Sequence, residues 1–185
     1  VLTPIQPFLS IGERINPASR KSLQEQIQRK EWSQLLLEAQ RQAEEGANAI
    51  DLNLGIEKTL DESAFSQVVC ELDKRSSVPI SFDIQTDKFL EVALREYPGR
   101  PLINSARVTP KSLENKIALL KRYGGTLILL AMGKEIPDTL EERVHIAFEG
   151  IRILEENGIT KDRILVDPLV LSMASGKDPK VTLGI

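Results

Sequence analysis

The stretch Gly46-Ala-Asn-Ala-Ile-Asp-Leu-Asn-Leu-Gly55 decides the fold, because an apolar run ends there in polar residues. Short apolar, β-branched runs of this kind recur along the chain and predict strands. They occupy residues 8–15, 47–54, 78–84, 101–106, 126–132, 163–169 and 181–185. Nearly continuous apolar strands alternating with helices are typical of a parallel sheet covered by helices.

Four amphipathic stripes between these runs predict helices, because their apolar residues recur every three or four positions. The stripes are Trp32, Leu35, Leu36, Ala39 and Ala43; Phe65, Val68, Val69 and Leu72; Leu113, Ile117 and Leu120; and Leu140, Val144, Ala147, Ile151 and Leu154. Thr139 and Glu142 have the spacing of a capping box, and Thr109-Pro110 has the pattern of a helix start.

Two parallel architectures compete for this pattern: an open doubly wound sheet and a (β/α)8 TIM barrel. The first turn, Gly12-Glu-Arg-Ile-Asn-Pro17, has one glycine instead of a glycine-rich phosphate loop, which favours the barrel. We expect residues 1–185 to form one α/β domain that stops short of a complete barrel after about residue 179. The eighth strand is missing, and the short segment before residues 181–185 indicates that a helix is absent between Pro179 and Lys180.

Composition limits the class of protein. The chain has 185 residues and a net charge of −3, with 41% hydrophobic residues. It carries no Lys/Arg run and no apolar run of the ~18–20 residues that span a bilayer, so neither nucleic acid nor a membrane is an expected partner. A single cysteine, Cys70, excludes an intramolecular disulfide and fits a cytoplasmic protein.

Polar side chains gather where the predicted strands end, which in a barrel is the face that holds the active site. They are Glu13 and Asn16, Asp51 and Asn53, Asp83, Asn104 and Ser105, and Asp167. No His, Cys or Lys joins them, which disfavours a zinc site or a Schiff-base lysine. Carboxylates and amides suit a heterocycle rich in N–H donors, such as the aminopyrimidinone of a pterin. A Mg²⁺-dependent lyase using the same acidic residues is an alternative.

Five segments in order resemble the pterin-binding methyltransferases. That family includes the methyltetrahydrofolate:corrinoid protein methyltransferases and the folate domain of cobalamin-dependent methionine synthase. The segments are Ile11-Gly-Glu-Arg-Ile-Asn16, Gly46 to Gly55, Phe82-Asp83, Ile103-Asn-Ser105 and Asp167-Pro-Leu169. The resemblance implies a dihydropteroate-synthase-like barrel, methyltetrahydrofolate as substrate, and a corrinoid (cobalamin) carried by a partner protein or domain. It also implies a homodimer.

The resemblance implies roles for these residues. The pterin would be held by Asp83, Asn104 and Asp167, with Ser105 beside them. Glu13 and Asn16 look like the catalytic pair near the pterin N5 and its methyl group.

Further residues look like supporting groups in the same family pattern. Asp51 and Asn53 would lie at the floor of the site, and Met132 would be an apolar neighbour of the folate.

Two departures from related patterns matter. Ile84-Gln85-Thr86 follows Asp83 where the family commonly has serine or threonine. Dihydropteroate synthase shares the fold and pterin site, but its Gly-Gly-Glu-Ser-Thr-Arg-Pro-Gly loop is replaced here by Leu52-Asn-Leu-Gly-Ile-Glu57. The absent loop disfavours the synthase as a relative. A synthase-like enzyme, or a pterin-binding module without activity of its own, is kept as the alternative to methyl transfer.

Overall fold

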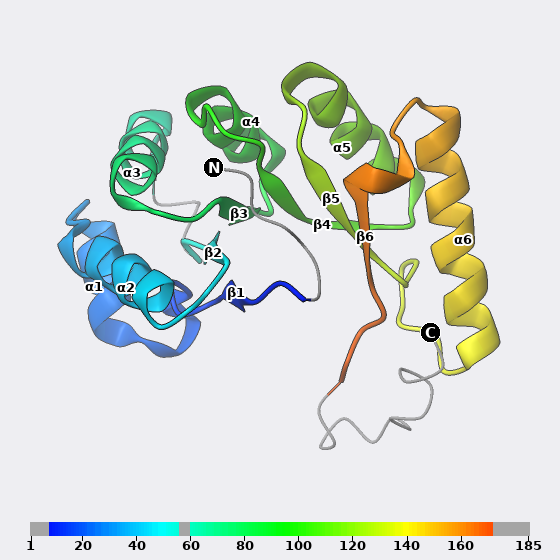
Figure 1. Ribbon diagram of the computed structural model, residues 1–185, viewed down its shortest axis with the longest axis horizontal. Helices are drawn as coiled ribbons and strands as arrows, with labels where there is room; N and C mark the ends of the chain where they lie inside the picture. Colours follow the sequence, from blue (N-terminus) through cyan, green and yellow to red (C-terminus); the bar gives the residue numbers. More distant parts are fainter. Residues whose placement is uncertain (1–7, 56–59, 172–185) are drawn as a thin grey trace. The chain divides into compact units, whose positions relative to one another are not determined.

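The computed structural model describes residues 8–55 and 60–171, in which six strands alternate with helices (Figure 1). The strands are β1 (Ile11–Gly12), β2 (Ala49–Leu52), β3 (Ile80–Asp83), β4 (Leu102–Arg107), β5 (Thr126–Leu130) and β6 (Ile164–Asp167). The α-helices are α1 (Lys21–Gln28), α2 (Ser33–Glu44), α3 (Glu62–Arg75), α4 (Asp87–Glu96), α5 (Pro110–Tyr123) and α6 (Leu140–Glu156). Within these residues, no helix has the length and hydropathy needed to cross a membrane.

The first six predicted strands are confirmed; β4 keeps the length of its apolar run, shifted by one residue, and the other five are shorter than theirs. The strand predicted at residues 8–15 shrinks to Ile11–Gly12 because side chains bind the backbone on both sides of it. The Ser10 amide donates to Asn48 Oδ1 at 2.9 Å, and the Arg14 amide donates to Gln42 Oε1 at 2.8 Å. The predicted strand at 181–185 and the joint between Pro179 and Lys180 lie outside the described residues.

All four predicted helices are confirmed as α2, α3, α5 and α6, and α1 and α4 are additional. The α4 helix buries Leu90, Ala93 and Leu94, which share one helical face, and Val92 beside them. Thr139 caps α6 as predicted, accepting a hydrogen bond from the Glu142 amide at 3.3 Å.

The start of α5 and two short 3-10 turns are the remaining local features of the described residues. Thr109 occupies the N-cap of α5, but its side chain makes no capping hydrogen bond. Two 3-10 turns, η1 (Pro17–Ser19) and η3 (Lys161–Arg163), precede α1 and β6.

The chain divides into two compact units, residues 1–102 and 103–185. In the first, β1, β2 and β3 are parallel and follow chain order. A Cβ on Gly12 would lie 2.6 Å from Gln42 Oε1, so Gly12 faces α2. Ile50 is the register partner of Gly12 and therefore faces the same way, whereas Asp51 faces away from α2.

The helix-facing side of this first unit is a packed apolar core. Phe65 of α3 stacks on Phe89 of α4 with ring centroids 4.4 Å apart, and Phe82 meets Tyr97 edge to face at 5.5 Å. Phe65 and Phe82 are fully buried, and each such side chain stabilises the fold by about 1.5–3 kcal/mol.

In the second unit, β4, β5 and β6 again follow chain order, and β5 pairs with β6 in parallel. The most buried line of α6 runs through Arg143, Ala147, Gly150 and Leu154. The predicted stripe is therefore only partly right, because Leu140, Val144 and Ile151 are half-buried. A charged residue and a glycine occupy positions that hydropathy assigns to the outside.

Candidate pterin site

Two pairs of polar side chains connect β2 to β3 on the face that points away from α2. Ser81 donates its hydroxyl to Asp51 Oδ1 at 2.6 Å, and both residues are buried. Asn53 donates to Asp83 Oδ2, also at 2.6 Å. Because side chains alternate along a strand, the Asn53–Asp83 pair lies one layer nearer the carboxyl ends of the strands than the Asp51–Ser81 pair.

The Asp83 carboxylate is held at both oxygens. Asn53 Nδ2 binds Oδ2, and Gln85 Nε2 binds Oδ1 at 2.9 Å. The Asn53 amide is itself fixed, because its Oδ1 accepts the Gly55 amide at 2.9 Å. Gly55 has a φ of 63°, a left-handed conformation that glycine adopts without a steric penalty. Asp83 is half-buried, so its remaining lone pairs can accept hydrogen bonds from a ligand.

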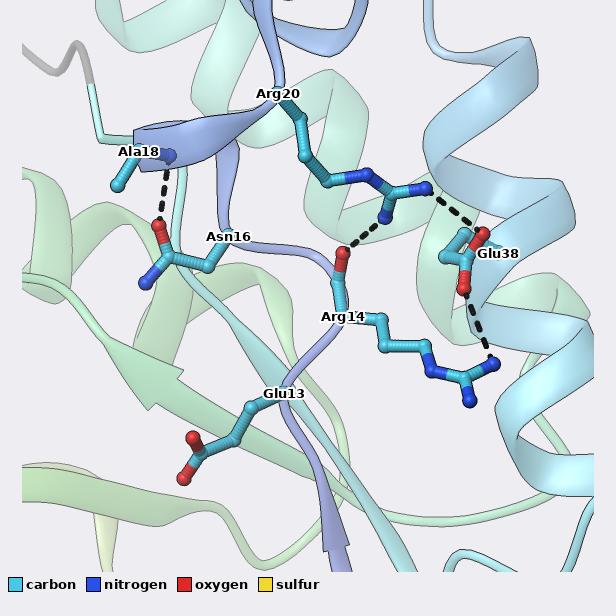
Figure 2. A pocket seen from close by; sticks show the side chains of 6 residues that line it. All are labelled: Glu13, Arg14, Asn16, Ala18, Arg20 and Glu38. Carbon is cyan, nitrogen blue, oxygen red and sulfur yellow. Dashed lines mark hydrogen bonds and ion pairs between the residues drawn. The ribbon is translucent and has the colours of Figure 1, made fainter.

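Glu13 and Asn16 line one pocket of about 600 Å³ in the first unit, together with Arg14, Ala18, Arg20 and Glu38 (Figure 2). Asn16 Oδ1 accepts the Ala18 amide at 3.0 Å and so caps the η1 turn. Asn16 Nδ2 has no hydrogen-bond partner among the described residues. Glu13 is exposed, and Figure 2 shows its carboxylate pointing away from the two arginines.

One wall of this pocket is an ion-pair network around Glu38, whose side chain is 10% exposed. Arg14 approaches Glu38 at 3.8 Å and Glu45 at 3.0 Å, while Arg20 lies 3.4 Å from Glu38. Arg20 also donates to the Arg14 carbonyl at 2.7 Å. The network holds the segment after β1 against α2, which fixes the backbone that carries Glu13.

In the second unit, the carboxyl ends of β5 and β6, which carry Met132 and Asp167, lie side by side. Leu130 is the register partner of Asp167, and the Ala131 amide donates to the Asp167 carbonyl at 2.9 Å. Met132 is buried and Asp167 is half-buried. Asp167 Oδ1 accepts the Leu169 amide at 2.7 Å, which fixes the direction of the carboxylate.

Asn104 and Ser105 lie in β4 and are both half-buried. The structure thus brings Asp51, Asn53 and Asp83 together in the first unit and places Met132 and Asp167 at neighbouring strand ends in the second. The convergence of Asp83 with Asn104 and Asp167 on one ligand spans both units and stays a prediction.

Sequence reasoning missed Ser81 and Gln85, which bind predicted site residues, and Arg143, which binds the loop after Asp167. Ser81 had a signal, because it stands two positions before Asp83 and so shares its face of β3. Gln85 was noted only as a departure from the family pattern, yet it binds Asp83. Arg143 gave no signal in the sequence.

Comparison with solved structures gives the fold. A dihydropteroate synthase from Xanthomonas albilineans in complex with 7,8-dihydropteroate has a TM-score of 0.63 at 20% identity, over 95% of this chain and 63% of that chain. The 7,8-dihydropteroate synthase from Vibrio fischeri ES114 has a TM-score of 0.60 at 16% identity, over 88% and 62%. The chain thus spans less than two thirds of these proteins. The likeness confirms the predicted dihydropteroate-synthase-like α/β barrel class.

A sequence model described as "Pterin binding enzyme" matches residues 12–184, which include every predicted site residue. The match and the polar groups at the strand ends agree on the class of ligand, and the chain belongs to the pterin-binding enzyme family.

Proposed function

We propose that this chain binds methyltetrahydrofolate and serves transfer of its N5-methyl group to the Co(I) of a corrinoid. The observation that carries the proposal is the Asp83 carboxylate, held at both oxygens by the Asn53 and Gln85 amides. A carboxylate fixed in this way can accept two parallel N–H bonds from the amino group and ring nitrogen of a pterin. Asn104 and Asp167 would bind other polar atoms of the same ring.

Methyl transfer places a specific demand on the residues near N5. When the methyl group leaves, N5 keeps the electron pair of the broken N–C bond and must gain a proton to become a neutral amine. Glu13 and Asn16 line one pocket and can serve this change together, Asn16 through its side-chain N–H groups. Hydrogen bonds and charge aimed at N5, with water carrying the proton, would lower the barrier.

The corrinoid belongs to a partner in this proposal. The sequence holds no Asp-x-His-x-x-Gly cobalamin loop, so a partner protein or domain would present the Co(I) that takes the methyl group. A homodimer in the cytoplasm is part of the same proposal, and it is carried by the family resemblance stated above.

Isothermal titration with methyltetrahydrofolate tests the site. We expect Asp83→Asn and Asn104→Ala each to weaken binding about ten- to a hundredfold, the value of a hydrogen bond to a charged or buried partner. Asp167→Asn should do the same. Asp162→Asn is the matched control, because the exposed Asp162 lies in η3, at the opposite end of β6. Unchanged affinity in Asp83→Asn would refute the assignment.

A dihydropteroate synthase activity is the second candidate, because the solved structures reported above are dihydropteroate synthases. Condensation of a dihydropterin pyrophosphate with 4-aminobenzoate, measured beside methyl transfer to free Co(I) cobalamin, separates the two reactions. Titration with Mg²⁺ against folates separates both from a Mg²⁺-dependent lyase. Methyl transfer without condensation would support our proposal, and condensation alone would overturn it.

A further inference from the structure

Arg143 is a charged residue in the core of the second unit. It lies in the first turn of α6 and is 1% exposed, which makes it the largest fully buried side chain among the described residues. Burying a guanidinium removes it from water at a high cost unless protein acceptors replace the water. The Arg143 guanidinium must therefore donate its hydrogen bonds to acceptors within the protein.

Those acceptors are backbone carbonyls on both sides of the α6 N-terminus. Arg143 Nη1 donates to the Pro168 carbonyl at 2.9 Å and to the Leu169 carbonyl at 3.2 Å. Its Nε donates to the Pro137 carbonyl at 3.2 Å. One side chain thus connects the loop that enters α6 to the loop that leaves β6.

The loop after β6 has an unusual backbone. Leu169 has a φ of 63°, a left-handed conformation that disfavours residues with a Cβ. In this conformation its amide donates to Asp167 Oδ1 at 2.7 Å. The direction of the Asp167 carboxylate therefore depends on the turn at Leu169. Arg143 binds the Pro168 and Leu169 carbonyls of this same turn.

We propose that Arg143 is a positioning residue, which holds the turn at residues 168–169 so that the Asp167 carboxylate points at the pterin. The inference rests on the proposed function in one respect, that Asp167 binds the pterin. Arg143 itself touches neither the pterin nor the methyl group in this assignment. Its guanidinium suits the task because one rigid fork donates several hydrogen bonds in fixed directions.

Hydrogen exchange at the Leu169 amide tests the positioning without any ligand. Replacing Arg143 by Met removes the three donated bonds described above, and we expect exchange at Leu169 to accelerate about tenfold or more, as in a local opening. Arg143→Lys keeps a charge and a donor and should accelerate it less. The Val108 amide, bonded to the Met132 carbonyl at 2.9 Å, reports any general loosening of the unit.

Arg152→Met on the same helix is the matched control, because Arg152 is exposed and pairs with Glu156 at 2.6 Å. It should leave the Leu169 amide unchanged. Equal protection of Leu169 in wild type and both Arg143 variants would overturn the positioning role. So would equal acceleration at Leu169 and Val108. Should Arg143→Met fail to fold, Arg143→Lys alone decides the question.

A double-mutant cycle then tests the link to the ligand. We expect Arg143→Lys to weaken methyltetrahydrofolate binding about tenfold, the value of a hydrogen bond to the loop that carries the binding group. In an Asp167→Ala background the same change should cost less than about twofold, because Arg143 acts through Asp167. A tenfold loss in both backgrounds would overturn the inference and leave the proposed function standing.

The remaining outcome separates the two claims. If the wild-type protein binds no pterin, the proposed function fails, and with it the claim that Asp167 is aimed at one. The exchange rates at Leu169 still decide whether Arg143 holds the turn.

Discussion

Removing the Ser81 hydroxyl should destabilise the protein, because the buried Asp51 carboxylate then loses a hydrogen-bond donor. Ser81 is 0% exposed and Asp51 is 5% exposed, so water cannot replace the lost donor. The 2.6 Å separation between Ser81 Oγ and Asp51 Oδ1 lies in the range of a hydroxyl bound to a carboxylate. Hydrogen bonds to charged groups contribute about 1.5–3 kcal/mol, and the deleted oxygen leaves almost no cavity.

We therefore expect Ser81→Ala to lower the free energy of unfolding by about 2 kcal/mol. For a domain of this size that corresponds to a fall in Tm of roughly 4–8 °C. Urea unfolding followed by circular dichroism measures both the midpoint and the slope. An unchanged slope would show that the effect is on stability and not on compactness.

A control and a cycle make the test specific. Ser63→Ala removes the same hydroxyl from an exposed position in α3 and should change stability by less than about 0.5 kcal/mol. In an Asp51→Asn background, Ser81→Ala should cost only about 1 kcal/mol, because the acceptor is then neutral. If Ser81→Ala is as mild as Ser63→Ala, the reasoning about the buried pair is refuted.

Three other changes follow from the same structure. Gly150→Ala should destabilise the protein by about 1 kcal/mol in urea unfolding, because the new Cβ would lie 2.8 Å from Leu129 Cδ2. This overpacking outweighs the gain in helix propensity. A stabilised variant would show that α6 can move away from Leu129. The Asp61 pKa is lowered by its hydrogen bond to Lys30 and by the amides at the α3 N-terminus. Its carboxylate therefore stabilises the fold above pH 3.8 and loses this effect as pH falls through the lower native pKa. Asp61→Asn should flatten the acid limb of a profile of stability against pH. An unchanged acid limb would contradict the assignment. Burial raises the Tyr97 pKa above 10.0, so its contribution is complete below pH 10 and is lost as pH rises through the native pKa. Tyr97→Phe should therefore lose less stability between pH 9 and 11 than wild type, whereas parallel profiles would exclude Tyr97 as the cause.

The candidate site could be predicted from the sequence at the level of strand ends. Asp51, Asn53, Asp83 and Asp167 each follow an apolar run, so their place at the carboxyl ends of parallel strands followed from periodicity and topology. Which of them touch could not be predicted, because that depends on register. The pairing of Asp51 with Ser81 requires these residues to be opposite each other, which the structure alone gives.

The helices show the same division. Phe65, Val68, Val69 and Leu72 form a stripe of α3 that hydropathy detects, and all four are buried. On α4, Leu90, Ala93 and Leu94 also recur at helical spacing and are buried, but this shorter stripe was not among the predicted ones.

The amino-acid sequence by itself determined the alternation of strands and helices, the barrel class and the edge at which polar groups gather. These features depend on local periods of burial, which the order of apolar and polar residues records directly. Only the tertiary structure decided that Arg143 and Gly150 face the core of their unit. A guanidinium is stable there because carbonyls of the loop before α6 and of the loop after β6 accept its hydrogen bonds, and a glycine fits there because the side chains of Val108 and Leu129 pack closely against the helix. The Pro168 carbonyl and the Leu129 side chain are far from these two positions in the chain, and no local pattern records such partners.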